Sequence, residues 1–178
     1  MRIKTCLALA VAGAFSISAA LATTLKEMTL TELSRAASVA VVGEITASRA
    51  AQTENGLVTV STVRVEKSMW GTNASTIQIE VMGGSEKRGK FNLGTTVAGS
   101  PILVRNQKAV FLLDRANTSD NFTLVGFNQG LLPVRETSLG AAVTLPGTGK
   151  EVSLAAAMNE INEAKASSTK KSADGIQR

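Results

Sequence analysis

The segment that most constrains the fold is residues 58–71, which read VTVSTVRVEKSMWG. Apolar and polar residues alternate along it, and the apolar positions are Val58, Val60, Val63 and Val65. A period of two is typical of a strand with one buried face. The odd spacing between Val60 and Val63 predicts a β-bulge near Ser61–Thr62, which would bend the strand. A long, bent strand suits a small closed barrel; two short strands separated by a loop are the alternative.

The first 22 residues have the pattern of a secretory signal peptide. Arg2 and Lys4 precede an uncharged run that ends in the small-residue exit Ala20-Leu21-Ala22. A basic start, an apolar middle and an Ala-x-Ala exit predict export and cleavage after Ala22. An uncleaved anchor is the alternative, because the run approaches the roughly 18 residues that a spanning helix needs. We expect a periplasmic or secreted bacterial protein with no membrane span after cleavage.

The mature chain is expected to have neither a thiol nor a disulfide, because the single cysteine, Cys6, lies inside the leader. Its stability must then come from core burial. Loss of Arg2 and Lys4 lowers the formal net charge from +5 to +3, which does not favour a nucleic-acid partner. The length suits a single domain, which we place at residues 23–165.

Helices are predicted at both ends of this domain. Thr29 and Glu32 have the spacing of a capping box for a short helix at about residues 30–37. Ser153 can cap a second helix that runs from Leu154 to about residue 165, with an apolar stripe along one face. Residues 166–178 lack periodicity, so we expect a disordered tail.

Strand patterns fill the middle of the chain. In residues 76–82 (TIQIEVM) the isoleucines and valine alternate with polar residues, which predicts a half-buried strand. Further strands are predicted at residues 38–50, 101–104, 108–114, 122–127, 130–134 and 141–145, with a polar connection at 50–56. One shared core is expected to contain Val63, Val65, Ile77, Ile79, Phe111 and Leu113.

The segment from Gly83 to Ser100 contains five glycines and shows no clear period. A structureless segment of this length in a compact domain is typical of a functional or a mobile loop. Its basic residues would attract an acidic partner, and an aromatic residue would provide an apolar anchor. The candidate partner-binding residues are Lys87, Arg88, Lys90 and Phe91, with Trp70 either capping the barrel or facing a partner.

Missing residue types limit the chemistry. The chain has no histidine, and its one cysteine lies in the leader. Histidine acid–base catalysis, thiolate nucleophiles and zinc sites of the usual nitrogen and sulfur type are therefore excluded for the mature protein. We expect no catalytic residue, metal site or cofactor. A hydrolase or transferase using Ser/Lys or carboxylates is the alternative, and a small-ligand carrier with an apolar cavity is a further one.

The order of these patterns resembles that in secreted bacterial proteins of uncharacterised function and in the netrin-like, or TIMP-like, module. The resemblance covers about residues 37–129 and rests on hydrophobic spacing, the opening ASVAVVGEIT and Gly71 at the end of the long strand. It implies a five-stranded OB-type barrel. The animal inhibitors chelate zinc with an amino-terminal cysteine. A chain that begins at Thr23 has none, so protease inhibition is not implied.

Together these observations predict a mainly β protein, a small OB-like β-barrel of five to seven strands with a short N-terminal helix and a C-terminal helix. We expect an exported, non-catalytic binding protein whose partner is a protein, a peptide or an envelope component. The oligomeric state is left open.

Overall fold

The computed structural model describes residues 25–54, 56–116 and 119–174. The predicted leader, its cleavage site and Cys6 lie outside these residues. Within the described ranges, no helix is both long enough and apolar enough to cross a bilayer.

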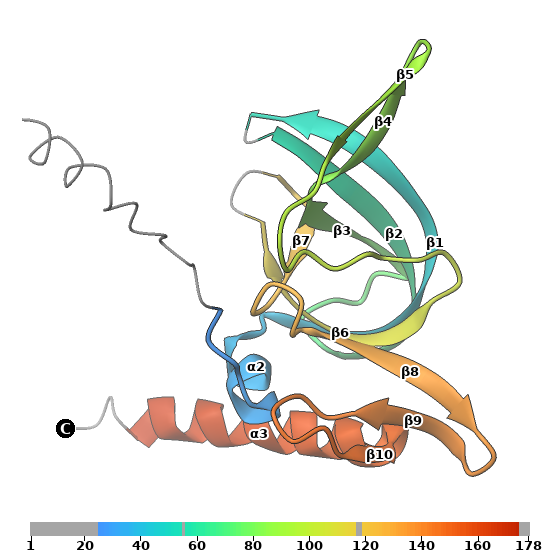
Figure 1. Ribbon diagram of the computed structural model, residues 1–178. Helices are drawn as coiled ribbons and strands as arrows, with labels where there is room; N and C mark the ends of the chain where they lie inside the picture. Colours follow the sequence, from blue (N-terminus) through green and yellow to red (C-terminus); the bar gives the residue numbers. More distant parts are fainter. Residues whose placement is uncertain (1–24, 55, 117–118, 175–178) are drawn as a thin grey trace, which may run out of the picture.

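The fold is mainly β, with one short helix before the strands and one long helix after them (Figure 1). The helices are α2 (Leu30–Ala36) and α3 (Leu154–Asp174). The strands are β1 (Val39–Thr53), β2 (Gly56–Trp70), β3 (Thr76–Met82), β4 (Gly84–Arg88), β5 (Phe91–Thr95), β6 (Lys108–Arg115), β7 (Phe122–Leu124), β8 (Leu131–Thr137), β9 (Gly140–Thr144) and β10 (Glu151–Ser153). Of these ten described strands, five form a partial ring, and the others lie outside it.

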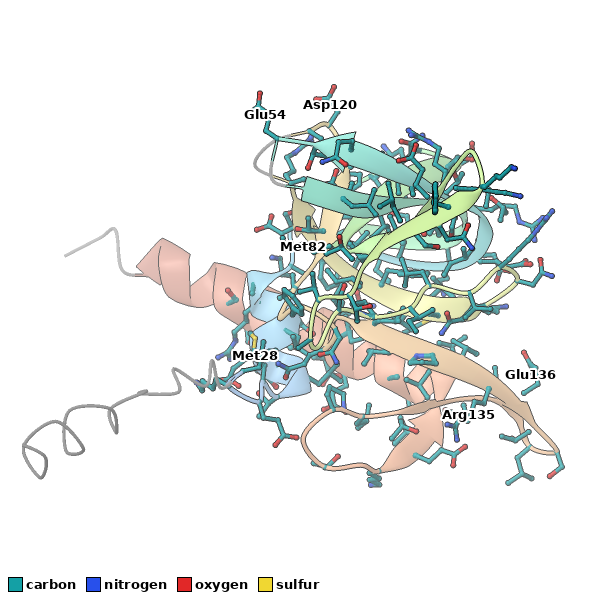
Figure 2. All side chains as sticks on the ribbon, turned by 45° about the horizontal axis from the view of Figure 1, so that its top comes forward. Met28, Glu54, Met82, Asp120, Arg135 and Glu136 are labelled. Atoms are coloured by element: carbon teal, nitrogen blue, oxygen red, sulfur yellow. The ribbon has the colours of Figure 1, made fainter. Side chains whose placement is uncertain are left out.

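Eight strands form one mixed sheet in the order β1-β2-β3-β7-β6-β8-β9-β10. Because β1 also pairs with β6, the strands β1, β2, β3, β7 and β6 form a partial ring (Figure 1). The contact between β3 and β7 is one parallel bridge, Ile79 to Phe122, whereas β1 and β2 pair along almost their whole length. The β8–β9 arm, which carries Arg135 and Glu136, lies on the other side of the ring from Glu54 and Asp120 (Figure 2).

β2 is one continuous strand, so the two-strand alternative is wrong. The bulge predicted near Ser61–Thr62 is not on β2, which pairs with β3 without a shift from Val58 to Arg64. The bulge lies instead on β1, where Thr46 is an extra residue in the pairing with β2, between Ile45 and Ala47. Its Oγ1 donates to the carbonyl of Thr62 at 3.2 Å. The valines of β2 move from one face of the strand to the other between Val60 and Val63. No extra residue is needed for this change, because both faces are buried here, one at Val60 and the other at Ser61.

Two hydrophobic clusters lie on opposite sides of β1 and β6. The predicted core group is confirmed for five of its six members, which are buried in the cluster inside the ring; Val65 packs against this cluster but is only partly buried. The second cluster lies between the ring and the two helices and includes Ala40 and Val42. Because residues 39–43 of β1 and 109–113 of β6 are covered on both faces, these two segments contain no polar side chain.

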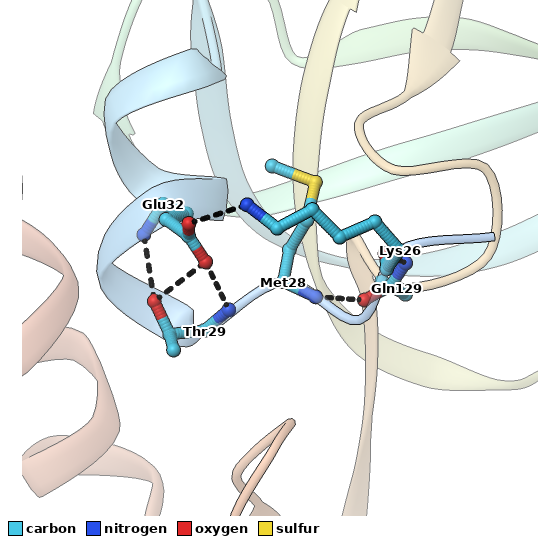
Figure 3. Close-up of polar contacts among 5 residues, drawn as sticks. All are labelled: Lys26, Met28, Thr29, Glu32 and Gln129. Carbon is cyan, nitrogen blue, oxygen red and sulfur yellow. Dashed lines mark hydrogen bonds and ion pairs between the residues drawn. The ribbon is translucent and has the colours of Figure 1, made fainter.

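The capping box of α2 is confirmed. The backbone N–H of Glu32 donates to Thr29 Oγ1 at 3.2 Å, and the backbone N–H of Thr29 donates to Glu32 Oε2 at 2.8 Å (Figure 3). The segment before the helix is fixed by Gln129, whose Oε1 accepts from the N–H of Met28 at 2.6 Å. The helix therefore begins at the predicted residue and is tied to the loop that follows β7.

The C-terminal helix begins where predicted, with the N–H of Ala156 donating to Ser153 Oγ. It ends at Asp174, so the prediction of disorder from residue 166 is wrong for residues 166–174; residues 175–178 lie outside the described part. The extension is stabilised by contacts with α2. Lys165 Nζ donates to the carbonyl of Ala37 at 2.6 Å, and Arg35 Nη2 donates to Ser167 Oγ at 3.5 Å.

The structure differs from the sequence prediction at three of the predicted strands. Residues 50–53 belong to β1, because they pair with residues 56–59 of β2. Residues 101–104 form no strand. β7 ends at Leu124, because the following residues Gly126 and Phe127 have positive φ angles, which a strand does not accommodate.

Candidate partner-binding hairpin

Residues 84–95 form a β-hairpin rather than the predicted structureless loop. β4 pairs with β5 from Gly84–Thr95 to Arg88–Phe91, which leaves Gly89 and Lys90 as a two-residue turn. Gly89 has a φ of +60°, a conformation that suits glycine and the tight turns of hairpins. The hairpin is a separate two-stranded sheet that projects away from the ring (Figure 1).

The base of the hairpin is fixed to the ring by hydrogen bonds. Thr59 Oγ1 of β2 donates to the carbonyl of Gly83 at 2.9 Å, and Ser100 Oγ donates to the carbonyl of Met82 at 2.6 Å. A side chain at Gly83 would approach the carbonyl oxygen of Thr95 to 2.7 Å, so the two ends of the hairpin meet in close contact. The hairpin thus starts from a defined position on the ring.

Large apolar side chains are exposed on the hairpin. Phe91 is 76% exposed and Leu93 is 50% exposed. Because alternate residues of a strand point to the same face, these two side chains share one face of β5. The sequence prediction included Phe91 but missed Leu93, which the alternation FNL indicated.

Basic residues accompany this apolar pair. Lys87 of β4 and Lys90 of the turn are exposed. Arg88 pairs with Phe91 through the backbone, and its side chain lies outside the described part of the structure. The structure therefore brings Lys87, Lys90 and Phe91 together on one hairpin.

Trp70 is not part of this group. It lies at the other end of β2, opposite Ala40 of β1, and packs against the cluster beneath the helices. Lys165 Nζ of α3 lies 5.6 Å from the centroid of its ring. Its Nε1 is buried with no hydrogen-bond partner among the described residues. The indole thus covers the helix-facing end of the ring.

Two clefts adjoin the hairpin. One, of about 420 Å³, lies where the hairpin leaves the ring, and its lining includes Arg49, Thr59, Met82, Ser85 and Pro101. The other, of about 290 Å³, lies between the hairpin and the β1–β2 turn, and its lining includes Gln52, Leu57, Glu86 and Leu93. Both clefts combine polar and apolar groups, which suits recognition of a chain that carries both.

Displaced pKa values are found away from the hairpin and have local causes. The pKa of Glu32 is lowered by its hydrogen bond from the Thr29 backbone N–H and, next, by the neighbouring Lys26. The pKa of Lys108 is raised by its hydrogen-bonded ion pair with Glu66, at 2.6 Å. Among the described residues, no group of three or more acidic, histidine or cysteine side chains could hold a metal ion.

Comparison of the chain with protein-family models and with curated proteins gave no match in either case. A proposal for function therefore rests on the geometry and chemistry of the hairpin.

Proposed function

We propose that this chain is an exported, non-catalytic binding protein that contacts a protein, a peptide or an envelope component through the β4–β5 hairpin. The observation that carries the proposal is the 76% exposure of Phe91 on a projecting hairpin, next to Leu93. Exposed aromatic side chains cost free energy in water, and they are frequent anchors in binding interfaces.

Charge supports the same surface. Lys87, on the face of the hairpin opposite the apolar pair, and Lys90, in the turn, are exposed, so an acidic partner would be attracted over a distance set by the ionic strength. The anchored base of the hairpin adds to this, because a surface held in position loses less conformational entropy on binding.

The scaffold in this proposal is an OB-type barrel. Support comes from the ring order β1-β2-β3-β7-β6, in which β6 returns to pair with β1. Export is proposed from the leader pattern at residues 1–22. The interior of the ring is filled by side chains such as Phe111 and Ile79, which favours contacts on the outside over a ligand carried within.

Capture from periplasmic extract by the immobilised protein tests the proposal. We expect Phe91→Ala to reduce capture of its partner strongly, because truncation of an anchor typically costs about 2 kcal/mol or more. Leu139→Ala is the matched control, since Leu139 is 98% exposed at the tip of the β8–β9 arm. Equal capture by the wild type and both variants would overturn the proposal.

A further inference from the structure

The outer edge of β5 is open. Within the described residues, β5 has a hydrogen-bonded neighbour on one side only, namely β4. Exposed sheet edges are usually protected by charged residues, proline, a bulge or a covering segment. The strand Phe91–Thr95 reads FNLGT, all five of its residues are exposed, and it pairs with β4 without a bulge. The edge therefore lacks these protecting features.

The register shows which backbone groups this edge offers. The Arg88–Phe91 pair closes the turn, and pairs alternate along an antiparallel ladder between bonded and non-bonded. The N–H and C=O groups of Asn92 and Gly94 are therefore directed away from β4. On the opposite edge of the hairpin, the backbone N–H and C=O groups of Ser85 and Lys87 are directed away from β5.

The two faces of the hairpin differ in chemistry. Phe91 and Leu93 share one face, and Leu93 lines the cleft of about 290 Å³ together with Leu57. The other face carries Asn92, with Lys87 directly opposite it in the register. A strand added beside β5 would thus lie next to Phe91 and Leu93 on one face and next to Asn92 on the other, with Lys87 one strand further away. Glu86, the register partner of Leu93, lies on the apolar face but on β4, away from the added strand.

Charge and size argue against a second copy of the chain as the occupant. The full chain has a formal net charge of +5, so two copies repel each other as they approach. A contact confined to one five-residue strand is also far smaller than the roughly 1,200 Å² of a standard interface.

We propose that the hairpin binds an extended peptide segment with alternating apolar and acidic residues, which adds as a strand to the free edge of β5. Backbone hydrogen bonds to Asn92 and Gly94 would hold the segment. Its apolar side chains would pack on Phe91 and Leu93, and its carboxylates would face Lys87. This inference rests on the proposed function, because it specifies how the same hairpin holds its partner.

A labelled eight-residue peptide of alternating valine and glutamate is the probe, with binding followed by fluorescence anisotropy. We expect the wild type to bind it, and a valine–lysine peptide to bind at least about tenfold more weakly. Two further valine–glutamate peptides, one N-methylated at every valine and the other at every glutamate, keep the side chains. In one of them the methyl groups replace the N–H groups that face β5, so that peptide cannot complete the ladder. It should lose binding by a similar factor, and undiminished binding of both methylated peptides would overturn strand addition.

Two matched proline variants test which edge of the hairpin binds the peptide. Asn92→Pro removes an outward N–H from β5, and Ser85→Pro removes one from β4, positions at which a sheet edge tolerates proline. We expect Asn92→Pro to weaken binding at least about tenfold and Ser85→Pro to stay within about twofold. Circular dichroism of both variants checks folding. Loss of binding in Ser85→Pro alone would overturn the assignment to β5.

The same variants separate this inference from the proposed function. If Phe91→Ala abolishes partner capture but Asn92→Pro does not, the hairpin binds without strand addition, and the inference fails alone. If neither variant affects capture, the proposed function fails as well. Sedimentation that shows a dimer lost in Asn92→Pro would assign the edge to a second copy and overturn the peptide.

Discussion

Lys165 of the C-terminal helix lies over Trp70 of the long strand β2, with Nζ 5.6 Å from the ring centroid. The same ammonium group donates to the carbonyl of Ala37 at 2.6 Å, where α2 ends. One side chain thus connects α3, the end of β2 and the C-terminus of α2.

The contact between Lys165 and Trp70 should contribute measurably to stability. Lys165→Met keeps the aliphatic stem but removes the charge, so a cation–π contact and a hydrogen bond to a helix carbonyl are lost. We expect the free energy of unfolding in urea to fall by about 1–2 kcal/mol. Lys150→Met, at an exposed position just before β10, is the control and should change it by less than about 0.5 kcal/mol. Equal effects would show that the contact contributes nothing specific.

Ile79 and Gln78 test the register of β3. Ile79 is fully buried inside the ring, whereas Gln78 is exposed. Ile79→Ala should lower the free energy of unfolding by roughly 2–5 kcal/mol, the sum of the transfer and cavity costs. Gln78→Ala should change it by less than about 0.5 kcal/mol. Denaturant titration measures both, and similar losses would mean that the assigned register is wrong, since a one-residue slip exchanges the faces.

The capping box predicts a pH dependence. The pKa of Glu32 is lowered in the folded state, so its contribution to stability is complete above the unfolded pKa of about 4.5. That contribution is lost as the pH falls through the folded pKa. Glu32→Gln retains a capping amide without the charge. The wild type should therefore be more stable than Glu32→Gln at pH 7, and the difference should vanish in acid. A difference independent of pH would contradict this.

Charge reversal of the hairpin should affect binding without affecting folding. We expect Lys87→Glu, Arg88→Glu and Lys90→Glu together to leave the melting temperature nearly unchanged, because the two described lysines are exposed. Partner capture should fall and lose its salt dependence. Capture that survives the triple change would exclude this charge cluster from recognition.

Export can be tested by the intact mass of the secreted product. A chain cleaved after Ala22 begins at Thr23 and carries no thiol. A thiol reagent under denaturing conditions should therefore leave its mass unchanged. Recovery of a product that retains Cys6 in the membrane fraction would contradict cleavage.

Local signals explain what the sequence could predict. Thr29 and Glu32 are three residues apart, so the helix start needed no knowledge of the rest of the chain. The strand Thr76–Met82 has one buried and one exposed face, and its alternation therefore gave the bounds correctly. The apolar run at residues 108–114 was likewise recognised, because a strand covered on both faces leaves a continuous signal.

The remaining features depend on information that a local pattern does not contain. β5 has no burial pattern because all five of its residues are exposed, and the half-buried positions of β4, Gly84 and Glu86, carry no apolar side chain. The extension of α3 depends on Lys165, whose partner Ala37 lies 128 positions earlier. The bulge was placed on the wrong strand, because a change in apolar phase does not show which of two paired strands holds the extra residue.

The first half of β1 separates the two hydrophobic clusters and contributes side chains to both. Val39 and Val41 face the cluster inside the ring, while Ala40 and Val42 face the cluster under the helices. A chain that loses α3 would keep every backbone ladder of the ring, yet it would expose to water the face of β1 that carries Ala40 and Val42. Such a fragment would expose a contiguous apolar surface on an otherwise intact ring, and we expect it to self-associate. By covering this surface, α3 disfavours association between copies of the ring.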